Sequence, residues 1–250
     1  MQHRDYLPVI EQESAWLADA LRAGEVSAPV PSCPGWTIGR LVKHTGTTHR
    51  WADAIVERRS TEPVDAKTLD LGLSADAQAD ARQLADWFER GAAHLTVTLA
   101  AVEPDVAVWS WAGRHHASFW SRRMAQETAV HRWDGEAARG EARAIAADLA
   151  VDGIDERFDN LPATMQRSGV AMTGEGETVH LHCTDRDGEW LVRLEADGPQ
   201  VTHEHAKGDV AARGPASDVL LLVYGRVPPD RLEVFGDVKL LRRFQELAKL

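Results

Sequence analysis

The stretch that decides the fold runs from Ser118 to Arg139 and reads SFWSRRMAQETAVHRWDGEAAR. It predicts one uninterrupted helix that carries Glu127, His131 and Asp134 at positions i, i+4 and i+7. This spacing places the three side chains on one face, about one turn apart, so that a carboxylate oxygen and an imidazole nitrogen can converge on one point. We interpret Glu127 and His131 as metal ligands, and Asp134 as a residue that holds neighbouring groups in place. The alternative is a surface helix with a charged stripe, which has the same spacing.

A second predicted helix supplies a further candidate ligand. It reads TIGRLVKHTGTTHRWADAIVERR, with Thr37 as its N-cap. His44 and His49 are five positions apart, so they point about 140° away from each other and cannot enter one site together. His44 lies three residues after Leu41, close to the apolar face, and we take it as the candidate ligand. His49 lies beside Arg50, and we expect it at the surface or in the outer surroundings of the site.

The first half of the chain is helical throughout. Asp5 to Arg22 and Ala75 to Val102 show helical periodicity, and Ala144 to Arg157 predicts a further helix. Four long helices are typical of a four-helix bundle, in which facing helices place inward-pointing ligands in the core. His115 and His116 precede the helix that begins at Ser118, and they are competing candidates for a metal ligand.

The pattern changes in the second half. Residues 178–197 read TVHLHCTDRDGEWLVRLEAD, two alternating runs around Asp187 and Gly188, which predicts a β-hairpin. A third strand is expected at 200–204, a helix at 216–224, a strand at 231–235 and a closing helix at 238–250. Strands mixed with helices after an all-helical half indicate a separate domain. We therefore predict a helical bundle over residues 1–160 and an α+β domain over 161–250.

Two H-x-H pairs lie in the second half, His180 with His182 and His203 with His205. Both members of a pair share one face of a strand, so a histidine-rich metal site is possible there. A row of histidines facing solvent would show the same alternation. Cys183 lies on the opposite, apolar side of its strand and is expected in the core.

Composition excludes several classes of function. A net charge of −11 and a pI near 5.4 argue against a general nucleic-acid binder, and no apolar run is long enough to span a membrane. Cys33 and Cys183 form no disulfide framework, and the first residues show no signal peptide, so we expect a cytoplasmic protein. By its distance along the chain, Cys33 is not expected to be a ligand beside His44. No G-x-S-x-G, G-x-G-x-x-G or P-loop motif occurs.

Three motifs together resemble a known family. They are CPGWTIGRLVKHTGTTHRWA at 33–52, FWSRRMAQETAVHRWDGEAA at 119–138, and GPASDVLLLVYGR at 214–226 followed by LEVFGD at 232–237. In this order and at these distances they are similar to the mycothiol-dependent maleylpyruvate isomerases of actinobacteria, members of the DinB-like metal-binding bundles. The resemblance covers nearly the whole chain. It implies a DinB-like four-helix bundle followed by a small α+β domain that resembles sterol carrier proteins.

The resemblance also implies a site. The metal ligands of the family match His44, Glu127 and His131, and a basic residue of the C-terminal domain that completes the substrate pocket is assigned to Arg226. Zinc is the first choice of metal, with nickel, iron or manganese as alternatives. Arg122 and Arg123 are further candidates for binding the carboxylate of an acidic substrate. The pocket is expected between the two domains.

The implied activity is attack of a metal-activated thiol, mycothiol, on a small electrophile. In the family's reaction this isomerises a maleylpyruvate-like acid from cis to trans. The alternatives are a mycothiol S-transferase that detoxifies electrophiles, and a metal-binding bundle without catalytic activity. The expected partners are therefore a small thiol and its electrophilic substrate, with no nucleic acid and no membrane, and the chain is expected to be a monomer or a weak dimer.

Overall fold

The computed structural model describes residues 1–140 and 142–248 and divides the chain into two compact units, Met1–Arg143 and Ala144–Leu250. The sequence places this boundary later, between residues 160 and 161. The difference arises because helix α6 (Ala147–Asp159) packs against α8 (Ala216–Val223) and so belongs with the second unit. Among the described residues, no helix combines the length and the apolar character that crossing a membrane requires.

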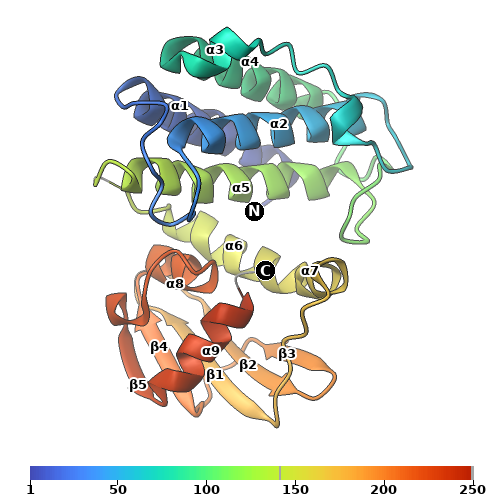
Figure 1. Cartoon of the computed structure of the whole chain (residues 1–250). Coiled ribbons are helices and arrows are strands. Elements are labelled where there is room, and N and C mark those ends of the chain that lie inside the picture. The colour runs from blue at the N-terminus through green and yellow to red at the C-terminus, as the bar shows by residue number, and fades with distance from the viewer. Residues whose placement is uncertain (141, 249–250) are drawn as a thin grey trace. The chain divides into compact units, whose positions relative to one another are not determined.

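The first unit is a bundle of four long helices (Figure 1). Each long helix packs mainly on two others, since α1 contacts α5 and α4, and α2 contacts α4 and α5, while α1 and α2 touch less extensively. Shorter elements precede α1 and fill the connection between α2 and α4. The elements are η1 (His3–Asp5), α1 (Tyr6–Arg22), α2 (Ile38–Glu57), η2 (Ala66–Thr68), α3 (Ala75–Ala79), α4 (Ala81–Ala100) and α5 (Ala117–Ala137). The fully buried core side chains include Ile10, Leu17, Leu21, Ile38, Leu41, Ile55, Leu84, Phe88 and Trp120.

Helix starts in this unit follow from capping side chains. The Thr37 hydroxyl accepts from the backbone N–H of Arg40, which confirms the predicted start of α2. The helix predicted from Ala75 to Val102 is interrupted. Asp80 has an extended backbone, and its carboxylate accepts from the N–H of Gln83, so it ends α3 and caps α4 as a new helix. A side chain that can cap competes with helix continuation at its own position.

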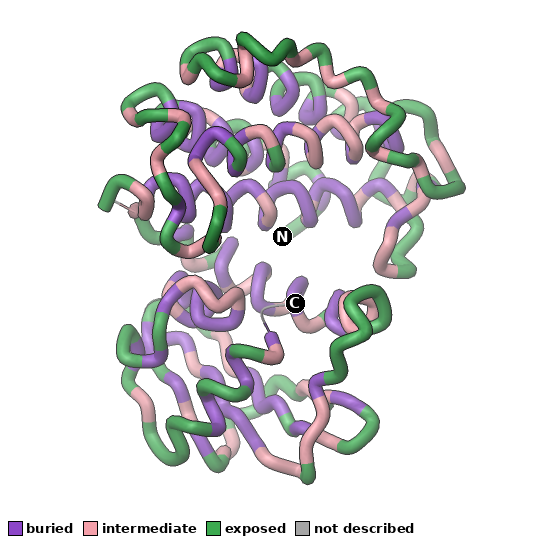
Figure 2. Tube along the Cα trace, in the orientation of Figure 1, coloured by how far each residue is buried: buried purple, intermediate pink, exposed green. Residues whose placement is uncertain are grey.

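Helix α5 is buried nearly all round, as Figure 2 shows along its length. An amphipathic helix keeps its polar face in solvent, but a helix that is buried on all sides has no such face. Helix α5 therefore buries charged residues as well as apolar ones. Arg132 is fully buried, and its guanidinium donates to Glu13 of α1 at 2.6 Å and to Glu136 at 2.9 Å. The same side chain also donates to the carbonyl of Arg143. This buried network ties α5 to α1.

The second unit contains one five-stranded sheet in the order β3-β2-β1-β4-β5. Neighbouring strands are antiparallel except β1 and β4, which are parallel. The elements are α6 (Ala147–Asp159), α7 (Leu161–Ser168), β1 (Glu177–Cys183), β2 (Glu189–Glu195), β3 (Gly198–Thr202), β4 (Val210–Gly214), α8 (Ala216–Val223), η3 (Pro229–Arg231), β5 (Glu233–Gly236) and α9 (Val238–Ala248). The predicted hairpin is confirmed as β1 and β2, and the predicted helix at 216–224 as α8.

Helix α7, strand β4 and the short η3 were not predicted from the sequence. Strand β4 reads VAARG, and its two alanines and terminal glycine give little of the β-branched signal that marks a strand. Its parallel partner β1 lies far away in the sequence, and local sequence patterns do not reveal such a pairing. The predicted closing helix is confirmed as α9, which is described as far as Ala248. The last two residues of that prediction lie outside the described residues.

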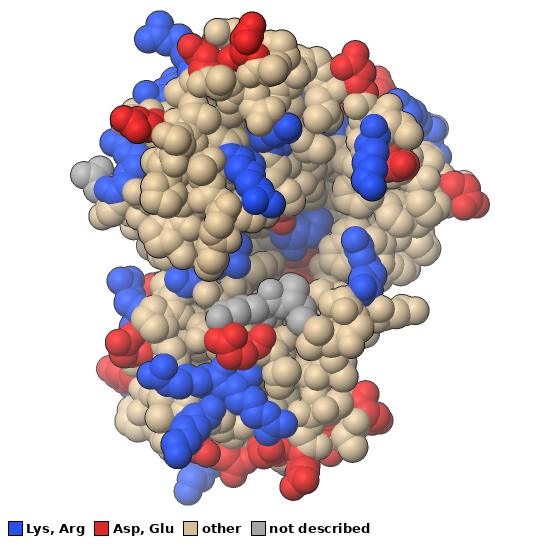
Figure 3. Space-filling model, in the orientation of Figure 1, with Lys and Arg blue, Asp and Glu red and all other residues tan. Residues whose placement is uncertain are grey.

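Helices α8 and α9 pack on β1 and β4, and they cover one face of the sheet. Val179, Leu181 and Cys183 of β1 are buried, which confirms the prediction that Cys183 lies in the core. The outer face of α9 is basic, and Figure 3 shows Lys and Arg side chains gathered over this helix. This group is small and partly neutralised, since Arg243 pairs with Glu177 at 2.7 Å.

We expect replacement of Arg132 by methionine to destabilise the first unit by about 3–5 kcal/mol, because the buried carboxylate of Glu13 loses its partner and that of Glu136 keeps only Arg143. Arg22→Met is the matched control. Arg22 also pairs with carboxylates, those of Asp19, Asp86 and Glu89, but at the surface, where such pairs contribute about 0–1 kcal/mol. Urea unfolding followed by tryptophan fluorescence measures this unit, since Trp190 is the one tryptophan after residue 133. Equal losses in both variants would contradict the account.

Candidate metal centre

Three side chains from two helices converge in the first unit. His44 lies on α2, and Glu127 and His131 lie on α5. The Nε2 atoms of His44 and His131 lie 3.1 and 3.2 Å from the same oxygen, Oε1 of Glu127. All three potential ligand atoms lie within 4.8 Å of one another. The structure thus brings together the three residues that the sequence proposes as metal ligands.

The other nitrogen of His131 is anchored by Asp134. The Nδ1–H of His131 donates to Oδ2 of Asp134 at 2.9 Å, and Asp134 is fully buried. Two residues of the connector between α1 and α2 donate to the same carboxylate, Ser32 Oγ at 2.6 Å and Cys33 Sγ at 3.4 Å. Asp134 therefore fixes the ring of His131 with Nε2 directed at Glu127, which is the arrangement expected around a metal-binding histidine.

Arg123 sits on the opposite side of Glu127. Its guanidinium donates to Oε2 at 3.0 Å, one turn before Glu127 on α5. Burial by itself would raise the pKa of Glu127, but the attraction of His131, the hydrogen bonds from both imidazoles and the charge of Arg123 hold this pKa well below its usual range. For His131, burial lowers the pKa, but the neighbouring carboxylates of Glu127 and Asp134 outweigh it and raise the pKa to about 9. Glu127 is thus held as a carboxylate.

Trp36 forms an aromatic wall beside the two histidines. Its ring lies 5.0 Å from the ring of His44, edge to face, and 6.3 Å from the ring of His131, stacked. The connector that carries it is held by a β-bridge between Pro29 and Thr37. The His44 side chain is 42% exposed, whereas that of His131 is 10% exposed. The group is therefore open to solvent on the side of His44.

The structure changes the interpretation of two neighbouring residues. His49 was expected at the surface or in the outer surroundings of the site. The surface alternative is wrong, because His49 is fully buried, hydrogen-bonds to Thr128 at 2.8 Å, and has its pKa lowered by burial to about 3. Helix α2 packs on both α4 and α5, so more of its circumference is buried than its apolar residues indicate. The other alternative agrees with the structure, since Thr128 is the neighbour of Glu127 on α5. Cys33 was not expected near the ligands, yet it reaches Asp134, because the connector folds back over α5.

The other two histidine candidates have partners elsewhere in the first unit. His115 Nδ1 accepts from the backbone N–H of Ser110, and His116 precedes α5 as its N-cap residue. Arg226 lies in the second unit just after α8, where its Nη1 donates to the carbonyl of Tyr224 at 3.0 Å. Its expected role in a substrate pocket stays a prediction, as does that of Arg122.

The donor set fits a divalent cation. A tetrahedral zinc with bonds of about 2.0–2.1 Å holds its donor atoms about 3.3 Å apart, close to the 3.1 and 3.2 Å between the imidazole nitrogens and Glu127 Oε1. Two imidazoles and one carboxylate with no fourth protein ligand are typical of catalytic zinc sites. Cys33, His131 and Asp134 form a second potential group, but it uses the side of His131 that Asp134 already occupies.

Sequence reasoning did not assign Ser32, Trp36 and Arg123 to the surroundings of the ligands. Ser32 and Cys33 stand between two prolines, Pro31 and Pro34, which make the connector stiff. A stiff connector holds its side chains in defined positions, so the two prolines could have indicated that Ser32 and Cys33 are held in place.

Two family models match the chain. The mycothiol maleylpyruvate isomerase N-terminal domain matches residues 7–136, and the MDMPI C-terminal domain matches residues 148–243. No curated protein matches the chain.

Solved structures show the same fold. The crystal structure of the mycothiol-dependent maleylpyruvate isomerase aligns with a TM-score of 0.55 and 15% identity, over 94% of this chain and 93% of that chain. A histidine-to-alanine mutant of it aligns with a TM-score of 0.55 and 14% identity over the same shares. A ubiquinone synthesis protein with an SCP2 domain covers 43% of this chain and 94% of its own, at 18% identity and a TM-score of 0.28, too low to carry an argument. The predicted architecture, a helical bundle followed by a small α+β unit, is confirmed.

We expect His44→Ala and His131→Ala each to hold one equivalent less of divalent metal than the wild type. Each removes one of the three ligands, and the His44 variant alters a side chain that is partly exposed. Metal per chain after zinc loading and gel filtration is measured by mass spectrometry. His94→Ala, which removes an exposed imidazole on α4, is the control and should match the wild type. If both site variants bind as much metal as the wild type, the metal does not bind at this position.

Asp134→Asn should weaken metal binding by about 10–100-fold while the protein stays folded, because the amide keeps the shape of the carboxylate but orients His131 less well. Competition with a chelator gives the affinity, and circular dichroism verifies the fold. An unchanged affinity would show that Asp134 does not position His131 for a metal.

Proposed function

Because the chain belongs to the mycothiol maleylpyruvate isomerase family, we propose that it is a metal-dependent enzyme that uses mycothiol to isomerise a small maleylpyruvate-like acid. The observation that carries this proposal is the convergence of His44 and His131 on one oxygen of Glu127. Three protein ligands leave room for a small molecule at the cation, as catalytic sites require. Zinc is the proposed metal, and nickel, iron and manganese suit the same ligands.

A divalent cation supplies one kind of chemistry here, since a thiol bound to it loses its proton and becomes a nucleophile near neutral pH. The charges around the ligands favour the binding of an anion at the metal. When His44 and His131 are neutral, as metal-binding imidazoles are, the carboxylates of Glu127 and Asp134 and the guanidinium of Arg123 leave one net negative charge. With a divalent cation the site becomes positive by one charge, which a thiolate would neutralise.

The protein's own residues hold this site in place. Asp134 fixes the imidazole of His131 through Nδ1, and Arg123 holds Glu127 in its ionised form. Since Arg123 is engaged with Glu127, it is a weaker candidate than Arg226 for binding a substrate carboxylate. The ring of Trp36 keeps water from one side of the two imidazoles, and the exposed side of His44 gives access to small molecules.

The reaction that we propose conserves the thiol. The thiolate sulfur adds to one carbon of the cis double bond, and the electron pair of that bond moves into the adjacent carbonyl as an enolate. Rotation about the resulting single bond follows. The enolate then restores the double bond in the trans form and expels the thiolate. We retain Arg226 as the residue that binds the substrate carboxylate, on the strength of the family motif that contains it.

The test is incubation of zinc-loaded protein with mycothiol and maleylpyruvate, with absorbance and mass spectrometry of the products. We expect the trans isomer without consumption of thiol. Glu127→Ala should lower kcat/KM by more than about 100-fold, since even the residues around metal ligands account for about 10–100-fold. Glu57→Ala, at the exposed end of α2, is the matched control and should keep full activity.

Two other outcomes would overturn the proposal. A stable thiol adduct in place of isomer would make the protein an S-transferase. No turnover with mycothiol and any electrophile, together with loss of stability on metal removal, would make the bundle a metal-stabilised binding protein.

A further inference from the structure

A second group of potential metal ligands lies on the sheet of the second unit, and none of its residues belongs to the three motifs that carry the family resemblance. His180 and His182 of β1 point to the face opposite Val179, Leu181 and Cys183, which are buried under the helices. In the β1–β2 register His182 pairs with Glu189, so the two side chains lie on the same face. This puts two imidazoles and a carboxylate together on the face away from α8 and α9.

The topology brings a third imidazole to this face. The chain has to pass from β3, at one edge, to β4, on the far side of β1. The crossing spans three strand spacings, about 14 Å, and residues 203–209, which connect β3 to β4, reach at most about 25 Å. The connection therefore runs directly over β2 and β1. It carries His205, whose Nδ1 lies 2.9 Å from Oε2 of Glu189.

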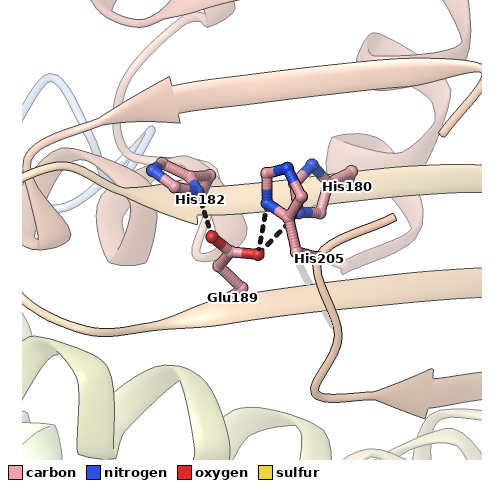
Figure 4. A group of neighbouring side chains, drawn as sticks. All are labelled: His180, His182, Glu189 and His205. Atoms are coloured by element: carbon pink, nitrogen blue, oxygen red, sulfur yellow. Dashed lines mark hydrogen bonds and ion pairs between the residues drawn. The ribbon is translucent and has the colours of Figure 1, made fainter. Parts of the chain in front are cut away.

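The four side chains surround one point, and Figure 4 shows three imidazoles directed at the carboxylate of Glu189. The distances to this carboxylate are 2.6 Å from His182 Nδ1, 2.9 Å from His205 Nδ1 and 3.5 Å from His180 Nε2. These values bracket the separation of about 3.3 Å that a tetrahedral zinc imposes on its donor atoms. The ring centroids lie 5.6–6.2 Å apart, and the four potential ligand atoms fall within 4.8 Å of one another.

One of these nitrogens lacks the hydrogen bond that burial requires. His180 is 6% exposed, and its Nε2 has no hydrogen-bond partner, although it faces the carboxylate at 3.5 Å. A buried polar atom without a partner is costly and calls for an explanation such as an ion. A cation at the centre of the group would supply the missing partner.

Two neighbouring side chains that could oppose a cation have acidic partners of their own. Arg213 of β4 is the register neighbour of His182, but its guanidinium lies 3.4 Å from Glu233 and is neutralised there. His203, the other histidine of the connection, does not belong to the group. It lies 6.0 Å from the ring of Trp190, with its Nε2 3.6 Å from Asp155 of α6.

We propose that His180, His182, Glu189 and His205 bind a second divalent transition-metal cation of the zinc class. Three imidazoles and a carboxylate form a closed set of four protein ligands, which is the arrangement of a structural site. The ligands come from β1, β2 and the β3–β4 connection. The cation would fasten that connection to the sheet and stabilise the second unit. This proposal does not depend on the proposed function of the first unit.

The test uses the full chain, stripped with a chelator and reloaded with Zn²⁺ alone. We expect the His182→Ala/His205→Ala variant to bind one equivalent of Zn²⁺ less than the wild type. The His44→Ala/His131→Ala variant should still bind the one Zn²⁺ of the site in the second unit. His203→Ala is the matched control, because it removes a histidine of the same connection that lies outside the group, and it should bind as much as the wild type. Glu189→Gln, which preserves shape, should weaken binding at least tenfold. Circular dichroism confirms that each variant is folded.

The second readout is stability. Zn²⁺ should raise the melting temperature of the His44→Ala/His131→Ala variant, and it should leave that temperature unchanged once His182 and His205 are also replaced. Equal zinc content in the wild type and the folded His182→Ala/His205→Ala variant would overturn the proposal. A lower content in His203→Ala would do the same.

Discussion

The first unit depends on the need to satisfy the charge of Glu127 inside a helical bundle. Its carboxylate meets two imidazoles at Oε1 and a guanidinium at Oε2, and these come from both α2 and α5. A buried charge is tolerated only where such partners exist. The same constraint acts along the rest of α5, where Arg132 and Asp134 are fully buried and hydrogen-bonded to groups of other segments. The helix is therefore specified by its polar partners as much as by apolar packing.

Local periodicity was enough to predict much of this architecture. The spacing of Glu127 and His131 placed both on one face of a helix, and the structure puts them 3.2 Å apart. Thr37 marked the start of α2, and the alternation around Asp187 and Gly188 marked the hairpin. In each case the residues that carry the pattern lie within the helix or turn that they predict. The geometry of that single helix or turn is therefore enough to predict the structure.

Features that depend on distant segments were not predictable in this way. The orientation of His49 is decided by the two helices that pack on α2, and Cys33 reaches Asp134 because the connector folds back over α5. Strand β4 is defined by parallel pairing to β1 rather than by its own residues. His205 joins His180 only because the β3–β4 connection crosses the sheet. The H-x-H spacing suggested that His203 was equivalent to it, and the structure separates the two.

We infer that one cation is held by His44, Glu127 and His131 in a site with an open position. Anomalous diffraction from zinc-soaked crystals, collected on both sides of the zinc absorption edge, would locate this cation. We expect a peak bonded to Nε2 of both histidines and to Glu127, with no fourth protein ligand and Asp134 still bound to His131 Nδ1. Absence of a peak at this point, or a peak closed by the sulfur of Cys33, would contradict it.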